Sequence, residues 1–440
     1  MRGPGSMSGP MPGGSMSLAS LKSALEAAQP ALRPGQHHYP GLFEADGITP
    51  QRHFPFWLVE PIAGEIEKTI ELQRLLTNGL CTINSSRMIS AWHIAQATVH
   101  RLLAGVAPDT IVSDVLDLAG ADKCNNQTYV GIYGSGIEKR IDIDSDVAVM
   151  PAAMAPKSLA RQLVFDIDRW DRAIFHPGIP RSVPNLAILV SQAVNPFQQQ
   201  GNFDTHKVQH LEACVQNTIR ALTLSSGCPF TRSWQASWID HPSIPYDGIG
   251  GYAASGNAEE VPKRRPVSDQ PVDALLAKHM YAAIDLLPDN VRAPIELATD
   301  RLRRSRVHGP SVDAALDLGV AGEIILLHPA ADSELSYRFA LRGAYLIAAN
   351  NDDRKEKFEA FRAMYAARSR AAHTGTLNAR HRARLAEFDN LCRAAICEII
   401  ERRSFPDWED LVLGMKKDVT EESSAPEATF RPHDTNDLPD

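Results

Sequence analysis

Apolar residues recur at helical spacing through most of the second half of the chain. Between residues 272 and 403 they return every three or four positions, as in an amphipathic helix. Short loops carrying Pro, Gly, Asn or Asp divide this stretch into six predicted helices: 272–287, 289–304, 312–328, 334–349, 353–373 and 377–403. A run of helices joined by short loops packs as a bundle, so we expect an all-α domain here.

The first half of the chain mixes helical and strand periodicities. Helical spacing predicts helices within 56–118 and over 206–224. Apolar runs bounded by Pro and Gly clusters predict strands at 128–134, 139–150 and 185–194. A mixed region followed by a separate run of helices predicts the α+β class.

Composition suggests where these parts begin and end. Residues 1–17 are rich in Gly, Pro, Ser and Met, and residues 415–440 form a polar, proline-punctuated acidic tail, so we expect disorder at both ends. The leader has no apolar core of the kind that a secretory signal needs. A linker-like stretch ending near 265 divides a mixed α/β region, 18–264, from the helical domain, 265–414.

The overall composition narrows the class of protein. The 440 residues are 44% hydrophobic and 22% charged, as in ordinary globular proteins, and no apolar run reaches the roughly 18 residues that would cross a bilayer. Six scattered cysteines without a CxxC pair indicate free thiols in a reducing compartment. We therefore expect a cytoplasmic protein with no membrane partner, disulfide, bound metal or cofactor.

Charge is distributed unevenly although the net charge is only −8. Between residues 361 and 386 there are two histidines, no acid and six arginines: Arg362, Arg368, Arg370, Arg380, Arg382 and Arg384. The apolar stripe of the predicted helix 353–373 includes Tyr365, and the same spacing continues to Arg368, whereas Arg370 falls on roughly the opposite face. A guanidinium on the protein-facing stripe requires an anion, a cleft or a subunit interface.

A histidine follows this arginine closely. His373 is five residues after Arg368, about 140° further round an ideal helix, so the two side chains converge best if the helix ends between them. Thr374 and Gly375 supply a helix end, with Gly375 as the left-handed residue. An imidazole near a guanidinium suits RNA cleavage by the 2′-hydroxyl, which requires proton transfer and neutralisation of a phosphorane.

The segment Arg368-Ser369-Arg370-Ala371-Ala372-His373 resembles the signature of the Apea-like branch of the HEPN superfamily. That signature is an arginine, a polar residue, three to five further residues and a histidine. Three flanking segments also resemble the family in order: 315–327, with an acid on a central helix, 336–348, with an arginine, and 405–414 at the close. The central helix has Gly322 where the family typically has leucine.

The resemblance implies a metal-independent endoribonuclease that acts as a homodimer, with two Arg–His pairs in one composite site. His373 would move the proton, Arg368 would bind the scissile phosphate and Ser369 would help to position it, giving a 2′,3′-cyclic phosphate and a 5′-hydroxyl. It further suggests a role in anti-phage defence or as a toxin-like effector. The alternative is an RNA- or nucleotide-binding scaffold that uses the same arginines for phosphate contacts alone.

We expect other residues to support the catalytic pair or to contact RNA. Glu323 and Arg342 interrupt apolar helical runs, so we expect them to pair with each other or to lie behind the catalytic pair. We expect Tyr365 to support the site, and Arg370, Arg380, Arg382 and Arg384 to contact RNA.

Four further patterns are interpreted as structural. The pair Arg303 and His308 repeats the spacing but indicates a solvated helix end. Gly134-Ser135 followed by Asp144 and Asp146 loosely resembles a nucleotidyltransferase site, yet the alternation of Asp142, Asp144 and Asp146 with Ile and Val is typical of a half-exposed hairpin strand. His206, His210 and Cys214 share a helix face without a second cluster of zinc ligands, and Trp234 and Trp238, near Arg232, are interpreted as packing aromatics.

Overall fold

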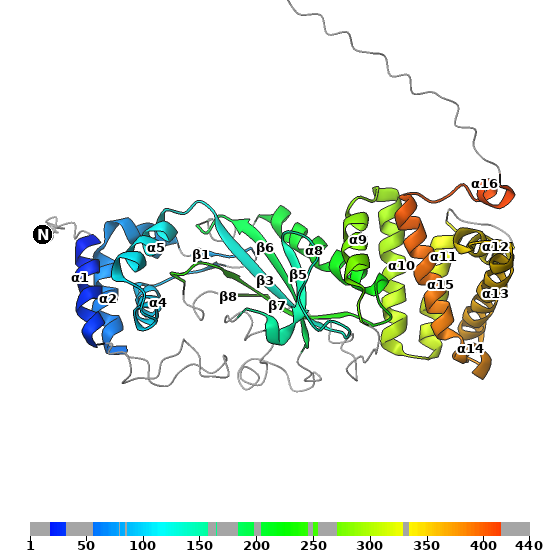
Figure 1. The fold of residues 1–440 in the computed structure, drawn as a ribbon, viewed down its shortest axis with the longest axis horizontal. Helices are drawn as coiled ribbons and strands as arrows, with labels where there is room; N and C mark the ends of the chain where they lie inside the picture. Colours follow the sequence, from blue (N-terminus) through cyan, green and yellow to red (C-terminus); the bar gives the residue numbers. More distant parts are fainter. Residues whose placement is uncertain are drawn as a thin grey trace, which may run out of the picture.

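The computed structural model describes residues 18–31, 56–78, 80–83, 86–156, 164, 184–197, 204–244, 250–253, 271–328 and 334–414. Helices gather at the N-terminal end, an antiparallel sheet lies in the middle and a helical bundle forms the C-terminal end (Figure 1). This arrangement confirms the α+β class. The expectations for residues 1–17 and 415–440 lie outside the described residues. In the part that is described, we find no helix that is both long and apolar enough to cross a membrane.

The N-terminal helices build a core of their own. They are α1 (Leu18–Ala28), α2 (Phe56–Lys68), α3 (Gln73–Asn78), α4 (Ala91–Leu103) and α5 (Pro108–Gly120), with short 3-10 turns at Gln29–Ala31 and Ile70–Leu72. Ile66 and Val99 are buried in this core, as the helical spacing predicts, and so is Leu25 of α1, a helix that the spacing did not predict. Ile239 and Ile244 join the same apolar cluster and connect it to the sheet. A two-stranded ladder, β1 (Leu80–Cys81) and β2 (Ser86–Arg87), follows α3.

The central sheet has six antiparallel strands in the order β4-β5-β6-β3-β7-β8. Their bounds are β3 (Cys124–Tyr133), β4 (Ile141–Asp142), β5 (Val147–Pro151), β6 (Leu186–Val194), β7 (Thr231–Ile239) and β8 (Gly250–Ala253). β3 and β6 pair from Cys124 opposite Val194 to Ile132 opposite Leu186. Helix α8 (Thr205–Leu224) covers one face, where its Val215 and Ile219 share an apolar cluster with Ile188 and Val190.

Two expectations for this region were wrong. The predicted strand 139–150 is two short strands joined by a turn at 143–146, because the Asp144 carboxylate accepts hydrogen bonds from the backbone N–H groups of Asp146 and Val147, at 2.7 Å each. Side chains of aspartate bond nearby backbone in this way and favour turns over continuous strand. In addition, β7 and β8 lie in the stretch 226–271, where we predicted no strand.

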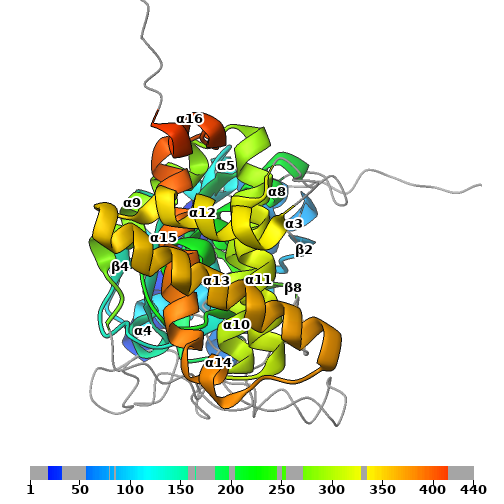
Figure 2. The same ribbon diagram turned by 90° about the vertical axis from the view of Figure 1, so that its right-hand side faces the viewer.

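The C-terminal bundle contains the helices expected from the apolar spacing. They are α9 (Ala274–Asp285), α10 (Asp289–His308), α11 (Val312–Leu326), α12 (Leu335–Ile347), α13 (Asn351–Thr374), α14 (Ala379–Ala383), α15 (Leu385–Arg402) and α16 (Trp408–Leu413). The predicted helix 377–403 is therefore divided into α14 and α15. Figure 2 shows α12 and α13 as the outer helices, lying across α11 and α15.

The bundle and the sheet share one apolar core. The cluster that contains Ile188 and Val190 of the sheet continues through α8 and α9 to Phe361 of α13. Ion pairs reinforce the contact: Arg220 of α8 lies 3.1 Å from Glu296 and 3.5 Å from Asp300, both on α10. The bundle therefore packs directly on the layer that covers the sheet.

Candidate functional site

Arg368 lies half-buried on α13 and binds a carboxylate of α11. Its side chain is 29% exposed, and Nη2 donates to Glu323 Oε2 at 3.0 Å. The same face of α13 buries Phe361 and Met364. The prediction that this arginine faces protein and needs an anion is confirmed. Arg370, expected on the opposite face, is exposed.

A glycine on α11 makes room for this arginine. A Cβ at Gly319 would lie 2.1 Å from Cγ and 2.4 Å from Cβ of Arg368, so the arginine stem rests on the bare α11 backbone. Glu323 is four residues later on the same helix face, where it meets the end of the guanidinium. A Cβ at Gly322 would lie 2.7 Å from the ring of Phe339 and 3.0 Å from the methyl group of Met364. Small residues thus set the close approach of α13 to α11.

The electrostatics of the pair follow from its burial. Burial raises the pKa of Glu323 above its ordinary value, and the Arg368 guanidinium opposes that rise. Glu323 is 21% exposed, so water reaches the pair from one side. Arg368 Nε is enclosed and has no hydrogen-bond partner in the described part of the chain. The guanidinium is therefore positioned by one carboxylate and keeps donor capacity at its exposed edge.

His373 lies on the same continuous helix as Arg368, which corrects one expectation. Helix α13 does not end between the two residues but runs through Thr374, and Gly375, with φ of 63°, ends it as predicted. The side chains therefore leave α13 about 140° apart and are separated by about 7.5 Å along its axis. No hydrogen bond or ion pair joins them among the described residues. His373 is exposed to solvent.

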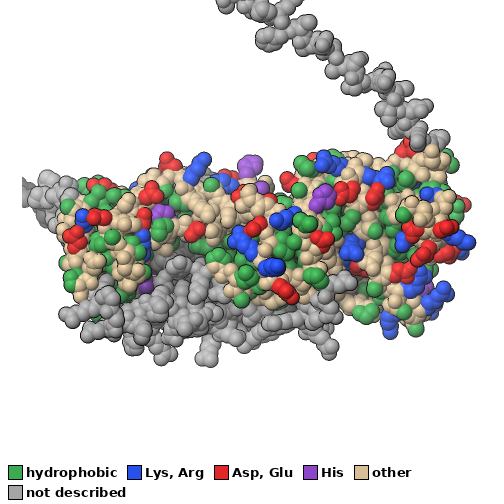
Figure 3. All heavy atoms as spheres, in the orientation of Figure 1, with side chains coloured by type: hydrophobic (Ala, Val, Ile, Leu, Met, Phe, Trp, Pro, Cys, Tyr) green, Lys and Arg blue, Asp and Glu red, His purple; other side chains and the backbone are tan. Residues whose placement is uncertain are grey.

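A cationic cluster surrounds the end of α13. Burial is the main cause of a lowered pKa at His381 of α14, and the charges of Arg380, Arg370 and Arg384 lower it further, which places these three arginines around one imidazole. His381 Nδ1 is enclosed without a hydrogen-bond partner in the described chain. Figure 3 shows Lys and Arg side chains gathered at this corner, over α14. We define Arg370, Arg380, His381, Arg382 and Arg384 as the α14 cationic cluster.

Glu387, just beyond the arginine-rich segment, offsets part of the positive charge of this cluster. The guanidinium of Arg384 binds both carboxylate oxygens of Glu387, at 2.7 and 2.9 Å. Arg380 and Arg382, by contrast, are exposed. We did not select His381 or Glu387 from the sequence, although the position of His381 between two arginines was a usable signal.

Of the two alternatives for Glu323 and Arg342, the structure excludes their pairing with each other, while Glu323 lies behind Arg368. Arg342 does not pair with Glu323: its Nη1 donates to the carbonyl of Leu326 at 2.9 Å, and the guanidinium lies 4.9 Å from the Trp408 ring centre. The reason is that Arg368 already occupies the Glu323 carboxylate. Tyr365 packs on the ring of Phe339, with ring centres 5.4 Å apart. Ser369 is half-buried beside Arg368.

The residues of the competing patterns lie apart or have local partners. The two halves of the nucleotidyltransferase-like pattern lie at opposite ends of β6. Asp146 lies opposite Ser191, and Gly134 N–H donates to the Asn185 side chain. From Asn185 to Ser191 there are about six residue steps of roughly 3.3 Å each along the strand. No group of three or more His, Cys, Asp or Glu side chains suited to a metal occurs in the described residues. His210 Nε2 is 3.5 Å from Cys214 Sγ, and all six cysteines are free.

Trp238 and His308, which belong to the two remaining patterns interpreted as structural, also have local partners. Trp238 stacks on Tyr129 with ring centres 4.3 Å apart, as expected for a packing aromatic. The imidazole of His308 at the end of α10 lies 3.8 Å from the Asp317 carboxylate. The side chain of Trp234 lies outside the described residues.

Comparison with known proteins gives no match to this chain: no family model, no curated protein and no solved structure is similar to it.

Proposed function

We propose that the α13–α14 end of the bundle binds RNA and cleaves it without a metal ion. One arrangement carries the proposal: Arg368 is held at the bundle surface by Glu323, and the exposed His373 follows it near the end of the same helix. An imidazole moves a proton, and a guanidinium neutralises a phosphorane. The exposed Arg370, Arg380 and Arg382 supply cations for a phosphate backbone at the same end.

The chemistry would be an internal transfer at phosphorus. The 2′-hydroxyl attacks the adjacent phosphate, His373 accepts its proton or gives one to the leaving 5′-oxygen, and the charge that develops on phosphorus is met by Arg368. Ser369 would help to position the phosphate. The phosphorus–5′-oxygen bond breaks, and the products carry a 2′,3′-cyclic phosphate and a 5′-hydroxyl.

A second copy of the chain would bring an imidazole and a guanidinium to the same phosphate. Because His373 and Arg368 of one chain leave α13 about 140° apart, one phosphate meets both groups most readily when the second group comes from a partner copy. We therefore propose a homodimer with composite sites. RNA cleavage of this kind arrests growth, and with the family resemblance it supports a defence or toxin-like role in the cytoplasm.

Cleavage of labelled RNA in EDTA tests the proposal. We expect wild-type protein to leave cyclic-phosphate ends, and His373→Ala and Arg368→Gln to lose cleavage by about 100-fold or more, as for loss of a general acid–base group. The glutamine keeps the part of the stem that rests on Gly319 and removes the charged group. The matched control is His308→Ala, which removes the histidine of the look-alike pair on α10 and leaves cleavage unchanged.

Mixing the two inactive variants tests the composite site. If sites are shared between copies, random reassortment of His373→Ala and Arg368→Gln chains restores about a quarter of the wild-type sites. No recovery in a mixture that does exchange subunits refutes the shared site. RNA binding by all forms without cleavage by any refutes the nuclease and favours the RNA-binding scaffold, which the α14 cationic cluster would also support.

A further inference from the structure

A second histidine lies in the α14 cationic cluster, and the proposed chemistry has a place for it. Attack by the 2′-hydroxyl releases a proton and departure of the 5′-oxygen takes one up, so the reaction uses a proton acceptor and a proton donor. His373 supplies one imidazole. His381 of α14 follows it eight residues later and has no role in the chemistry as described so far.

The turn after α13 holds His381 against the end of the bundle. Gly375, with φ of 63°, ends α13, and the buried side chain of Leu377 anchors the turn that follows. Asn378 then begins α14, and its Oδ1 accepts the backbone N–H of His381 at 2.7 Å. The short helix contacts both α13 and α15 at this end (Figure 2). The backbone of His381 is therefore fixed and not part of a free loop.

The two ring nitrogens of His381 have different surroundings. Nδ1 is enclosed and has no hydrogen-bond partner in the described part of the chain, while the side chain as a whole is partly exposed. The exposed edge of the ring therefore carries Nε2, and this is the nitrogen that a substrate can reach. In a doubly protonated ring both nitrogens are donors, and the enclosed one would lack an acceptor. The ring is therefore held in its neutral form.

Cations from α13 and from α14 and its end face this ring. Burial lowers the pKa of His381, and the charges of Arg380, Arg370 and Arg384 lower it further. Arg370 also lies three residues before His373, so the two side chains are neighbours on one face of α13. Arg370 thus belongs to the surroundings of both imidazoles, and a phosphate bound at its guanidinium would lie near both.

We propose that His381 is the second proton-transfer residue of the nuclease and acts as its base. This inference rests on the proposed cleavage of RNA at the end of α13. Nε2 of His381 takes the proton of the 2′-hydroxyl while that oxygen bonds to phosphorus; the bond from phosphorus to the 5′-oxygen breaks, and His373 gives the leaving oxygen a proton. Arg370 meets the charge of the phosphorane together with Arg368. Both rings regain their starting protonation by exchange with water.

An RNA with sulfur in place of the 5′-oxygen at the cleaved linkage separates the two histidines, because a thiolate leaves without being protonated. On ordinary RNA in EDTA, His381→Ala and His373→Ala of the full chain should each lose about 100-fold or more in rate. On the 5′-thio RNA, His373→Ala should recover most of its loss, whereas His381→Ala should recover none. The control is His279→Ala, which removes an exposed imidazole paired with Glu401 on α15 and should cleave both RNAs as the wild type does.

The dependence of the cleavage rate on pH gives a readout that a structural role would not move. A base is inactive once it is protonated, so the rate should fall on the acid side with the pKa of His381. Arg380→Ala removes one facing charge and raises that pKa, so the acid limb should move to higher pH. Arg384→Ala should move it less, because Glu387 already offsets that charge.

A conservative variant separates chemistry from folding. His381→Asn keeps a polar group near the position of Nδ1 and lacks Nε2, so it should melt as the wild type does and still lose cleavage. A cleavage rate equal to that of the wild type in either His381 variant overturns the proposal, as does rescue of His381→Ala by the 5′-thio RNA or an unmoved acid limb in Arg380→Ala. Absence of cleavage by the wild type on both RNAs is a different result, because it refutes the nuclease itself.

Discussion

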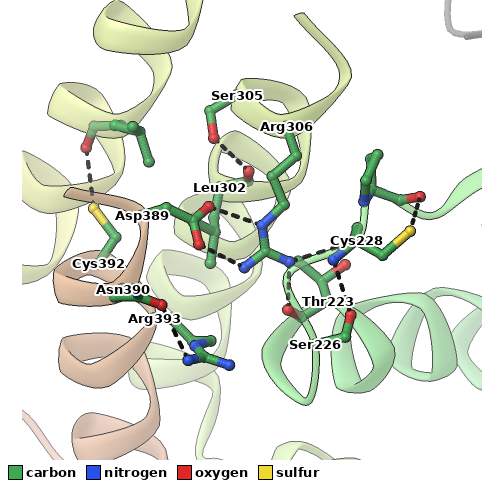
Figure 4. A network of polar contacts seen from close by, with 12 residues as sticks. Thr223, Ser226, Cys228, Leu302, Ser305, Arg306, Asp389, Asn390, Cys392 and Arg393 are labelled. Atoms are coloured by element: carbon green, nitrogen blue, oxygen red, sulfur yellow. Dashed lines mark hydrogen bonds and ion pairs between the residues drawn. The ribbon is translucent and has the colours of Figure 1, made fainter. Parts of the chain in front are cut away.

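One buried arginine joins α10 to α15 and to the end of α8, and its removal should cost much of the stability of the protein. Arg306 of α10 is 6% exposed; Nε and Nη2 bind the two Asp389 oxygens of α15 at 2.8 and 3.0 Å. Nη1 donates to the carbonyls of Thr223, at the end of α8, and Cys228, at 2.6 and 3.3 Å. Figure 4 shows this guanidinium between the three segments. Arg306→Met keeps the apolar stem and removes every one of these bonds.

The magnitude follows from what the substitution leaves behind. Asp389 is 16% exposed and would stay charged without its partner, a change that costs about 3–5 kcal/mol when a buried ion pair is broken. The whole free energy of unfolding of a domain is about 5–15 kcal/mol. The double variant Arg306→Met, Asp389→Leu should recover the part of the loss that comes from the unpaired carboxylate, since apolar replacement of a buried pair is often neutral. The two carbonyls would still lack a donor, at about 1–3 kcal/mol each.

Urea unfolding followed by circular dichroism measures both variants against Arg402→Met. That control breaks an exposed pair with Glu398, with side chains 39% and 37% exposed, and should cost less than about 1 kcal/mol. The reasoning is refuted if Arg306→Met costs no more than the control, or if the double variant is less stable than the single one.

Three further predictions concern the site. Gly319→Ala should displace the Arg368 stem, lower the free energy of unfolding by about 1–3 kcal/mol and reduce RNA cleavage, as read from urea midpoints and the cleavage assay. In Arg368→Met, burial alone acts on Glu323, so its pKa rises further and the folded state gains a proton relative to the unfolded state. The free energy of unfolding then falls as pH rises from the Glu323 pKa of the unfolded state to that of the folded state. The variant should therefore lose more stability at about pH 7 than at about pH 5. The His381 pKa, measured by NMR titration, should lie below 6.5 and should rise in Arg380→Ala.

Each of these has a control in the same chain. Gly64→Ala, in the middle of α2 with nothing within 4 Å of the new methyl group, should raise stability by about 1 kcal/mol. Glu323→Gln combined with Arg368→Met should remove the extra pH dependence. Arg402→Ala, on another helix, should leave the His381 titration in place. A Gly319→Ala protein as stable as wild type would show that the arginine stem is not held against α11.

Local periodicity predicted much of the fold because each bundle helix carries its own apolar stripe. The position of Arg368 on that stripe predicted that it faces protein, which the Glu323 contact confirms. The pairing itself was not predictable, since Arg342 and Arg368 are equally plausible partners of Glu323 from spacing. The choice depends on Gly319, which lets the arginine stem cross α11.

Other features of the structure could not be predicted from the sequence, mostly because they depend on long-range contacts. The helix end at Gly375 was predicted, but the break between Arg368 and His373 that would bring their side chains together is absent from α13, because no residue between them disfavours a helix and the alanines there favour it. β7 was missed because its strand character comes from pairing with β3 and β8 and not from a continuous apolar run.

The shared core of sheet and bundle has a practical consequence for dissecting the protein. A fragment that starts near residue 265 would contain every residue of the proposed nuclease site, yet it would uncover the faces of α9 and α10 that α8 packs against. Glu296, Asp300 and Arg306 would all lose their partners in α8. A fragment that begins at Asp204 would keep α8 but would uncover the face of α8 that packs on Ile188 and Val190, so the proposed nuclease site should be tested in the full chain.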